Sequence, residues 1–170
     1  AAGVSVGVIY KYFGDKQSLF LACVRHSLEL LDATLREAVP EGADAETSIR
    51  ALVPALIAAA RQHGNYNVLY NEITSGSCRE FAPELAREIE SRTAQLYTRL
   101  FETAKEAGAL APGLAPEAAA FFFDNLLMML QFSYSCDYYQ HRMRLYCGKP
   151  SAAQDAWMTE QLTHFILGCI

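Results

Sequence analysis

Apolar residues recur at intervals of three and four along almost the whole chain after residue 15, and no stretch alternates apolar with polar residues. The first spacing places side chains on one face of an α-helix, whereas the second would indicate a half-buried strand. The pattern therefore predicts an all-α fold. The expected helices after the N-terminal region are 16–38, 44–63, 65–74, 83–107, 117–143 and 152–170.

Proline and glycine set the expected ends of these helices. Pro40 and Gly42 end the helix 16–38, and Gly64 ends the next one. Gly108 suits the position just after the last turn of helix 83–107. Pro54 lies inside the helix 44–63, so it predicts either a kink or a displaced start.

The composition indicates a chain with a large core, since 52% of the 170 residues are hydrophobic and 19% are charged. No apolar run reaches the roughly 20 residues that span a bilayer. The nearest run, 118–132, contains Asp124, Asn125 and Gln131, and is expected to be a buried helix. The five cysteines lack Cys-x-x-Cys spacing, which argues against a disulfide scaffold and favours a reducing, cytoplasmic location.

The first twenty residues predict a short helix between two turns. Gly3 supplies a tight turn, and Ser5 is expected to cap the helix with its side chain. Ile9 and Phe13 are four residues apart and are expected to face the core, while Asp15 caps the following helix. The residues left to point outward are Val6, Gly7, Tyr10 and Tyr12.

Residues 2–20 resemble the TetR family of bacterial transcriptional repressors. The family pattern Ala-Gly-Val-Ser-x-Gly-x-Ile/Leu-Tyr-x-Tyr/His-Phe matches from Ala2 to Phe13, and Lys-x-x-Leu follows at Lys16. The resemblance implies a helix that reads a DNA major groove. By position, the groove-facing residues are Val6, Gly7, Val8, Tyr10 and Tyr12, and the phosphate contacts are Ser5, Lys11 and Lys16. The alternative is that the tyrosines only pack this motif.

Family members carry two further helices before this point, a supporting helix and the first helix of the helix-turn-helix. We therefore interpret the sequence as N-terminally incomplete. A recognition helix without its partner helix loses the surface on which it packs. We expect the chain alone to bind DNA poorly and the intact protein to bind well.

The charge is unevenly distributed. Residues 1–25 contain three basic residues, Lys11, Lys16 and Arg25, and one acidic residue, Asp15, so their net charge is +2. Because the whole chain has a net charge of −5, the remaining residues have a net charge of −7. A locally basic region on an acidic body suits contact with phosphates.

The segment 117–143 is apolar on nearly every side, so it needs cover on more than one face. Together with the last helix it could form a four-helix bundle with a second copy. The last two helices are also the dimerisation surface in the TetR family. The alternative is an ordinary monomer core. The expected interface residues are Phe122, Leu126, Met129, Ser133, Met158, Leu162, Phe165 and Cys169.

The rest of the body is expected to hold an effector pocket with apolar and aromatic walls. The same residue types also make ordinary cores, so both interpretations stay open. The expected ligand is a small hydrophobic molecule such as a fatty acyl chain. The candidate lining residues are Tyr66, Tyr70, Tyr97, Phe101, Asn125, Met128 and Phe132.

Metal binding and catalysis have little support. Asp137 and His141 have helical ligand spacing, but a third ligand is missing and two arginines lie nearby. Gly76-Ser77-Cys78 lacks the Gly-x-Ser-x-Gly frame of a nucleophile elbow. We therefore expect no enzymatic activity, no metal and no cofactor.

These observations predict two regions: residues 1–38 as the remainder of a DNA-binding head with a connecting helix, and 39–170 as a ligand-binding and dimerisation domain. The predicted function is a homodimeric repressor that leaves a palindromic operator when an effector binds the body and shifts the helix 16–38. No membrane partner is expected. The alternative is a non-catalytic helical protein that binds an apolar ligand and has no role in transcription.

Overall fold

Within residues 3–73, 82–148, 152–168 and 170, which the computed structural model describes, all the regular secondary structure is helical. The predicted all-α class is confirmed. No helix in these ranges is both long and apolar enough to cross a membrane. The helices are α1 Val6–Phe13, α2 Lys16–Ala38, α3 Ala45–Gln62, α4 Gly64–Glu72, α5 Ala82–Glu106, α6 Pro116–Ser135, α7 Asp137–Cys147 and α8 Ala152–Leu167.

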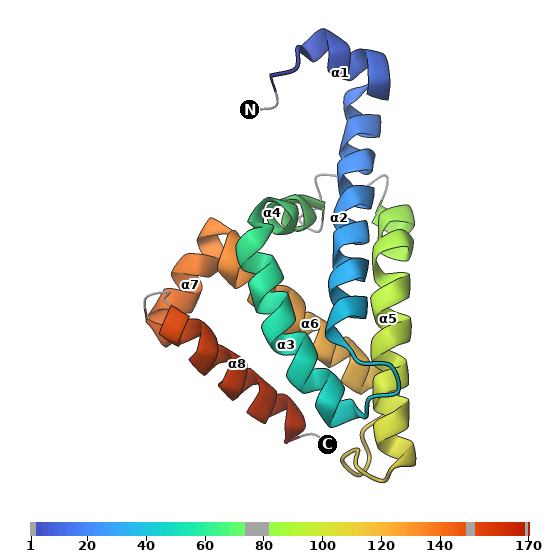
Figure 1. Cartoon of the computed structure of the whole chain (residues 1–170), viewed down its shortest axis with the longest axis vertical. Coiled ribbons are helices and arrows are strands. Elements are labelled where there is room, and N and C mark those ends of the chain that lie inside the picture. The colour runs from blue at the N-terminus through green and yellow to red at the C-terminus, as the bar shows by residue number, and fades with distance from the viewer. Residues whose placement is uncertain (1–2, 74–81, 149–151, 169) are drawn as a thin grey trace.

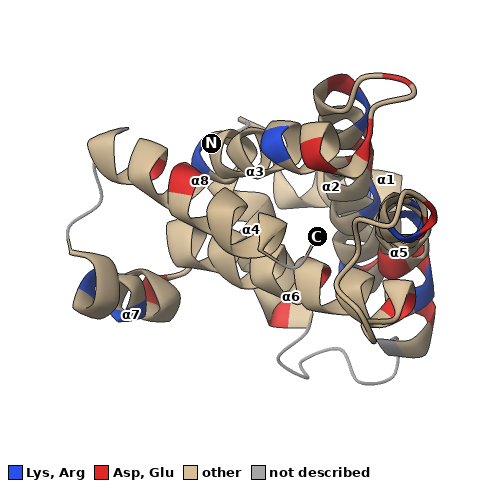
Figure 2. Ribbon diagram, turned by 90° about the horizontal axis from the view of Figure 1, so that it is seen from below, with Lys and Arg blue, Asp and Glu red and all other residues tan. Residues whose placement is uncertain are grey.

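The long helix α2 separates α1 from the body of the molecule. Figure 1 shows α1 at one end of α2, while α3, α6 and α8 lie towards the other. Along its length α2 runs beside α5, where Arg25 makes two hydrogen bonds of 3.2 Å to the Glu88 carboxylate. Arg92 of α5 lies 3.3 Å from Asp32 of α2. These charged pairs connect α2 to α5, and Figure 2 shows acidic and basic residues on both helices.

Side-chain caps begin both α2 and α3 as the sequence indicated. Asp15 accepts a hydrogen bond of 2.7 Å from the backbone N–H of Ser18. Asp44 does the same for Thr47, also at 2.7 Å. Such caps satisfy amide donors that have no partner inside the helix. The bounds predicted for helix 16–38 are confirmed.

The main core forms around α3, which packs against α2, α6 and α8. Ile49, Leu52 and Val53 on its inner face are completely buried. Pro54 lies on the exposed side, and the helix continues through it. Because α3 begins at Ala45, the alternative of a displaced start is wrong.

The predicted single helix 117–143 is wrong, because the chain breaks between α6 and α7. Cys136 adopts an extended conformation with φ −105° and ψ 131°. The preceding Ser135 accepts a hydrogen bond of 2.8 Å from the Asn67 side chain of α4 and donates one of 3.3 Å to the Ala60 carbonyl of α3. These tertiary contacts fix the break, although neither proline nor glycine marks it in the sequence.

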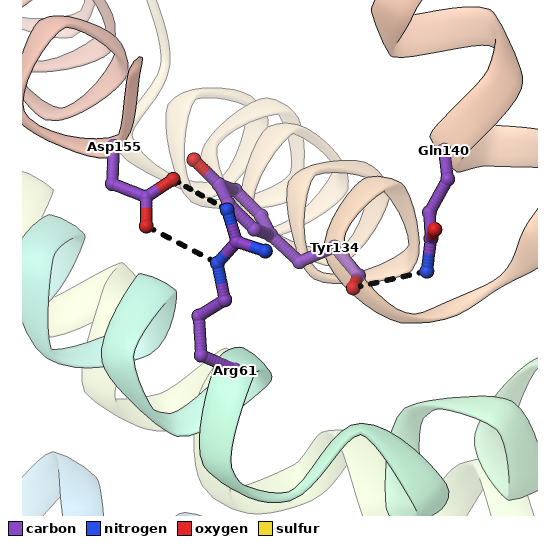
Figure 3. Close-up of polar contacts among 4 residues, drawn as sticks. All are labelled: Arg61, Tyr134, Gln140 and Asp155. Atoms are coloured by element: carbon purple, nitrogen blue, oxygen red, sulfur yellow. Dashed lines mark hydrogen bonds and ion pairs between the residues drawn. The ribbon is translucent and has the colours of Figure 1, made fainter. Parts of the chain in front are cut away.

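Helix α8 is attached to the body by a polar cluster (Figure 3). Arg61 of α3 donates hydrogen bonds of 3.1 and 2.7 Å to the Asp155 carboxylate of α8. The guanidinium carbon also lies 4.5 Å from the ring centre of Tyr134 on α6. Gln140 of α7 donates to the Tyr134 carbonyl at 3.3 Å. One small cluster thus joins α3, α6, α7 and α8.

Candidate functional site

Helix α1 presents its tyrosines to solvent. Tyr10 is 51% exposed and Tyr12 is 79% exposed, and Val6 and Gly7 are exposed as well. The expectation that these four residues point outward is confirmed. Ile9 is only half-buried and Phe13 is exposed, so neither reaches a core among the described residues. The reason is the position of α1 at the far end of α2, away from the body (Figure 1).

Backbone hydrogen bonds, without a side-chain cap, form the first turn of α1. The Ser5 carbonyl accepts hydrogen bonds of 3.0 Å from Val8 and 3.3 Å from Ile9. The Ser5 side chain makes no capping hydrogen bond, so that expectation is wrong. The turns on both sides of α1 use glycine at positive φ, 64° at Gly3 and 78° at Gly14, where a side chain would be strained.

The cations near α1 differ in their surroundings. Lys11 and Lys16 are exposed. Arg25, by contrast, is engaged with Glu88. The positive charge next to the exposed tyrosines therefore comes from the two lysines.

A cavity of about 80 Å³ lies between α2, α4, α5 and α6. Four of the expected lining residues meet here: Tyr66, Tyr70, Tyr97 and Met128. The contribution of α2 consists of Val24, Ser27, Leu28 and Leu31. The helix that carries α1 is therefore also a wall of the cavity.

Two carboxylates in this cavity were not among the residues expected from the sequence. Glu90 of α5 accepts a hydrogen bond from the Tyr70 hydroxyl, and Asp124 of α6 lies nearby. Burial, followed by the negative charge of Glu90, raises the pKa of Asp124 to about 6. Among the residues that the structure describes, the lining contains no Lys, Arg or His.

Burial also raises the pKa of the Tyr70 hydroxyl, and the charge of Glu90 adds to the effect. The pKa of Tyr97 is raised mainly by burial as well, with Asp124 as the next cause. Both phenols therefore stay neutral in the ordinary pH range. The cavity combines neutral aromatic walls with two acidic groups.

An outer groove of about 390 Å³ between α5 and α6 adjoins the cavity. Asn125 belongs to this groove, where its side-chain amide donates a hydrogen bond of 2.7 Å to the Phe121 carbonyl. The residues that line both spaces are Tyr70, Glu90, Thr93, Asp124 and Met128. These shared side chains form the boundary between the two spaces.

Two expected ligand contacts line neither the cavity nor the outer groove. The buried Phe132 ring packs against Tyr70 and Tyr139, with centroid separations of 5.7 and 5.6 Å. Phe101 is buried against Phe123 at 5.7 Å. Both rings support the packing of the body instead of lining the cavity.

A third space, an open apolar groove of about 800 Å³, is formed by α6, α7 and α8. Phe165 at one side is 63% exposed. Four of the expected interface residues line this groove: Phe122, Leu126, Met129 and Phe165. On α6, Phe122 is 57% exposed and lines this groove, whereas Phe121, at 65%, lines the outer groove.

The other expected interface residues lie elsewhere. Ser133 is buried within the protomer, and its hydroxyl donates a hydrogen bond of 2.8 Å to the Met129 carbonyl. Met158 and Leu162 pack against the protomer's own core. Cys169 lies outside the described residues.

Neither of the other motifs considered in the sequence forms a built site in the described ranges. Asp137 and His141 are both exposed on α7. No group of three or more His, Cys, Asp or Glu side chains is placed to hold a metal in the part of the chain that the structure describes. The Gly76-Ser77-Cys78 segment lies outside it.

Comparison with known proteins links this geometry to a class of regulators. The model of the family "Bacterial regulatory proteins, tetR family" matches residues 1–23. The chain is 32% identical over 127 residues to "HTH-type transcriptional regulator BetI" of Paraburkholderia phymatum, covering 74% of this chain and 64% of that protein. It is 34% identical over 100 residues to the protein of that name from Paraburkholderia xenovorans, covering 58% and 50%.

A third protein with the same name, from Stenotrophomonas maltophilia, is 31% identical over 100 residues, covering 58% of this chain and 50% of that protein. The chain thus spans between about half and just under two thirds of the length of these relatives.

Proposed function

We propose that this chain, which belongs to the TetR family of bacterial regulatory proteins, acts as a ligand-responsive, DNA-binding transcriptional repressor. The observation that carries the proposal is the combination of two features on α2. The exposed tyrosine helix α1 lies at its N-terminal end, and the aromatic cavity lies against its side.

In this proposal α1 enters a major groove of the operator. Tyr10 and Tyr12 are exposed on either side of the exposed Lys11, and the exposed Lys16 follows at the start of α2, which suits base contact beside phosphate contact. The base-facing set is Val6, Gly7, Val8, Tyr10 and Tyr12, and the phosphate-facing set is Ser5, Lys11 and Lys16.

The apolar groove of α6, α7 and α8 is proposed to be covered by a second copy of the chain. Phe122 and Phe165 expose large apolar side chains along one continuous apolar groove, and a second copy of the chain would bury this surface. A two-fold dimer would present two α1 helices and would therefore select a palindromic operator. The proposed interface is Phe122, Leu126, Met129 and Phe165.

Ligand binding is proposed to reach α1 through α2. Val24, Leu28 and Leu31 line the cavity from α2, so a ligand that enlarges it displaces this helix. The displacement changes the separation of the two α1 helices in the dimer, and operator affinity falls. Couplings of this kind are typically worth about 1–3 kcal/mol.

The proposal is tested by selection from a randomised DNA pool with the natural gene product that contains this chain. We expect enrichment of an inverted repeat. Tyr12→Ala should weaken binding to the selected DNA by about tenfold. Tyr146→Ala is the matched control, because that tyrosine on α7 is equally exposed at 79% and should leave the affinity unchanged.

Lys11→Gln should weaken binding to all sequences alike and lower the salt dependence of binding by about one ion. Failure of any DNA sequence to be enriched would refute the proposal. Ligand binding without DNA selection would favour the alternative of a helical binding protein with no role in transcription.

A further inference from the structure

We infer that Tyr70, Glu90 and Met128 form a gate between the cavity and the outer groove, and that a ligand reaches the cavity through this gate by passing between α5 and α6. The inference rests on the proposed function, because it describes how the same cavity is filled. It adds a route of entry that is separate from the helix through which the cavity is proposed to act on α1.

The boundary between the two spaces consists of side chains. Tyr70, Glu90, Thr93, Asp124 and Met128 line both the cavity and the groove. Side chains change rotamer much faster than helices move, because a rotamer change does not displace the backbone. The boundary can therefore open while α5 and α6 keep their positions.

A second wall of the cavity is closed by the core. Val24 of α2, Ile73 and Ile89 of α5 all line the cavity, and all three are buried in one apolar cluster. An opening through this wall would separate the cluster and expose apolar surface to water. Such an opening costs more than the rotation of a boundary side chain.

The side of the cavity formed by the start of α4 is held by contacts to other elements. The Tyr66 ring lies 5.8 Å from the ring centre of His26 on α2 and 5.8 Å from that of His63. The Asn67 side chain donates a hydrogen bond of 2.8 Å to Ser135 of α6. A passage on this side would disrupt several contacts at once.

The boundary itself is held by less. The Tyr70 hydroxyl donates a hydrogen bond to Glu90 and so connects α4 with α5. Met128 is unbranched, and its side chain adapts easily to new surroundings. Thr93 stays in place, because its hydroxyl donates a hydrogen bond of 3.2 Å to the Glu90 carbonyl of its own helix. Breaking one side-chain hydrogen bond and turning Met128 therefore opens the gate.

The position of the gate separates entry from signalling. In the part of the chain that the structure describes, every residue lining the outer groove comes from α4, α5 or α6, and none from α2. A ligand can thus pass the gate without displacing α2. The proposed displacement of α2 then follows from occupancy of the cavity.

Thiol labelling measures access to the cavity directly. Ser27 lines the cavity from α2 and does not line the outer groove, so Ser27→Cys places a thiol inside the gate. The probe is methyl methanethiosulfonate, a small neutral reagent, and peptide mass spectrometry follows its reaction. Trypsin releases residues 26–36 as a peptide that has no natural cysteine. The exposed Cys23 lies in the preceding peptide and reports the reaction in open solvent.

Filling the outer groove should slow the labelling. Ala94 is exposed on α5 and lines the groove without lining the cavity, so Ala94→Trp should slow reaction of the introduced thiol at least about fivefold and leave Cys23 unchanged. Gln95→Trp is the matched control, because Gln95 is exposed on the same helix and lines neither space.

Thermal melting verifies that each variant is folded. Thr98→Trp narrows the same groove from the next turn of α5, and it decides the matter if Ala94→Trp does not fold. Unchanged labelling in a folded groove-filling variant overturns the inference.

Releasing the gate should have the opposite effect. Tyr70→Phe keeps the ring and removes the hydrogen bond to Glu90, so labelling should become about three- to tenfold faster. Tyr66→Phe is the matched control, because Tyr66 lines the cavity but not the groove. Equal acceleration in both variants would contradict the assigned gate.

The labelling is measured without DNA, so its outcome is independent of the proposed function. A gate that responds as expected in a protein that selects no DNA sequence would support the inference and count against the proposed function. Sequence-specific DNA binding by a protein whose labelling ignores the groove variants would leave the proposed function in place and overturn the inference alone.

Discussion

Arg61 and Asp155 face each other across α3 and α8, joined by hydrogen bonds of 3.1 and 2.7 Å to the two carboxylate oxygens (Figure 3). The Asp155 carboxylate raises the pKa of the Arg61 guanidinium through these hydrogen bonds. The same guanidinium lies over the Tyr134 ring. The pair therefore anchors α8, one of the helices that form the apolar groove, to the centre of the body.

Replacing Asp155 with Asn should lower the free energy of unfolding by about 1 kcal/mol, because both partners are partly exposed and solvent weakens the pair. Urea unfolding monitored by circular dichroism measures the change. Glu160→Gln serves as the control, since Glu160 is exposed on the same helix. An equal loss in both variants would show that the Arg61 pair has no special role.

Phe123 is the aromatic centre of the body. Its ring meets Tyr97 edge-on at 4.9 Å and Phe101 at 5.7 Å, and it is almost completely buried. Phe123→Ala should lower the free energy of unfolding by about 3–5 kcal/mol, because it removes apolar burial and leaves a cavity. Phe121→Ala on the same helix is the control, because Phe121 is 65% exposed and its loss should cost less than about 1 kcal/mol.

The ends of α2 and α3 could be predicted because local signals determine them. Asp15 and Asp44 cap the two helices through contacts three residues away, and such contacts are visible in the sequence. The break at Cys136 could not be predicted in this way. It depends on Ser135 meeting α3 and α4, which are more than sixty residues distant along the chain.

The candidate site was predictable only in part. The aromatic residues were identified because their type suggests a cavity wall, but a cavity wall and a core look alike in a sequence. Phe132 illustrates this, since its ring packs against Tyr70 and Tyr139 and does not line the cavity. Asp124 had a usable signal: it lies one helical turn before Met128, which was expected at the cavity. Glu90 had a similar signal, because it lies seven residues before Tyr97 on the same helix face, and Tyr97 was also expected at the cavity.

The apolar groove predicts a specific way to separate the dimer. Phe165→Asp places a charge in the groove and should raise the dimer dissociation constant by about 30-fold or more. Sedimentation velocity over a concentration series measures this. Leu145→Asp is the control, because Leu145 is 87% exposed on α7 and does not line the groove.

If the unmodified protein sediments as a monomer at every concentration, the proposed dimer is incorrect. If Leu145→Asp separates the dimer as well as Phe165→Asp does, a dimer exists but the assigned surface is incorrect.

Asp124 should make the free energy of unfolding depend on pH in a direction opposite to that of a capping carboxylate. Its pKa is about 6 in the folded protein and 3.8 in the reference state. Between these two pH values the folded state therefore binds more protons than the unfolded state. The contribution of Asp124 to the free energy of unfolding is fully present below about pH 4 and is lost as the pH rises to about 6. The charged and titratable groups that line the two spaces with it are Glu90, Glu117, Tyr66, Tyr70 and Tyr97.

Asp124→Asn removes this titration and keeps the size of the side chain. At pH 7 the variant should be more stable than the unmodified protein by about 1 kcal/mol, a value reduced for partial exposure to solvent. At pH 4 the difference should largely disappear, because Asp124 is then protonated in the folded protein. Urea unfolding of both proteins at pH 4, 5, 6 and 7 measures the trend. A difference that is constant across this range would mean that Asp124 is not held in an unfavourable charged state.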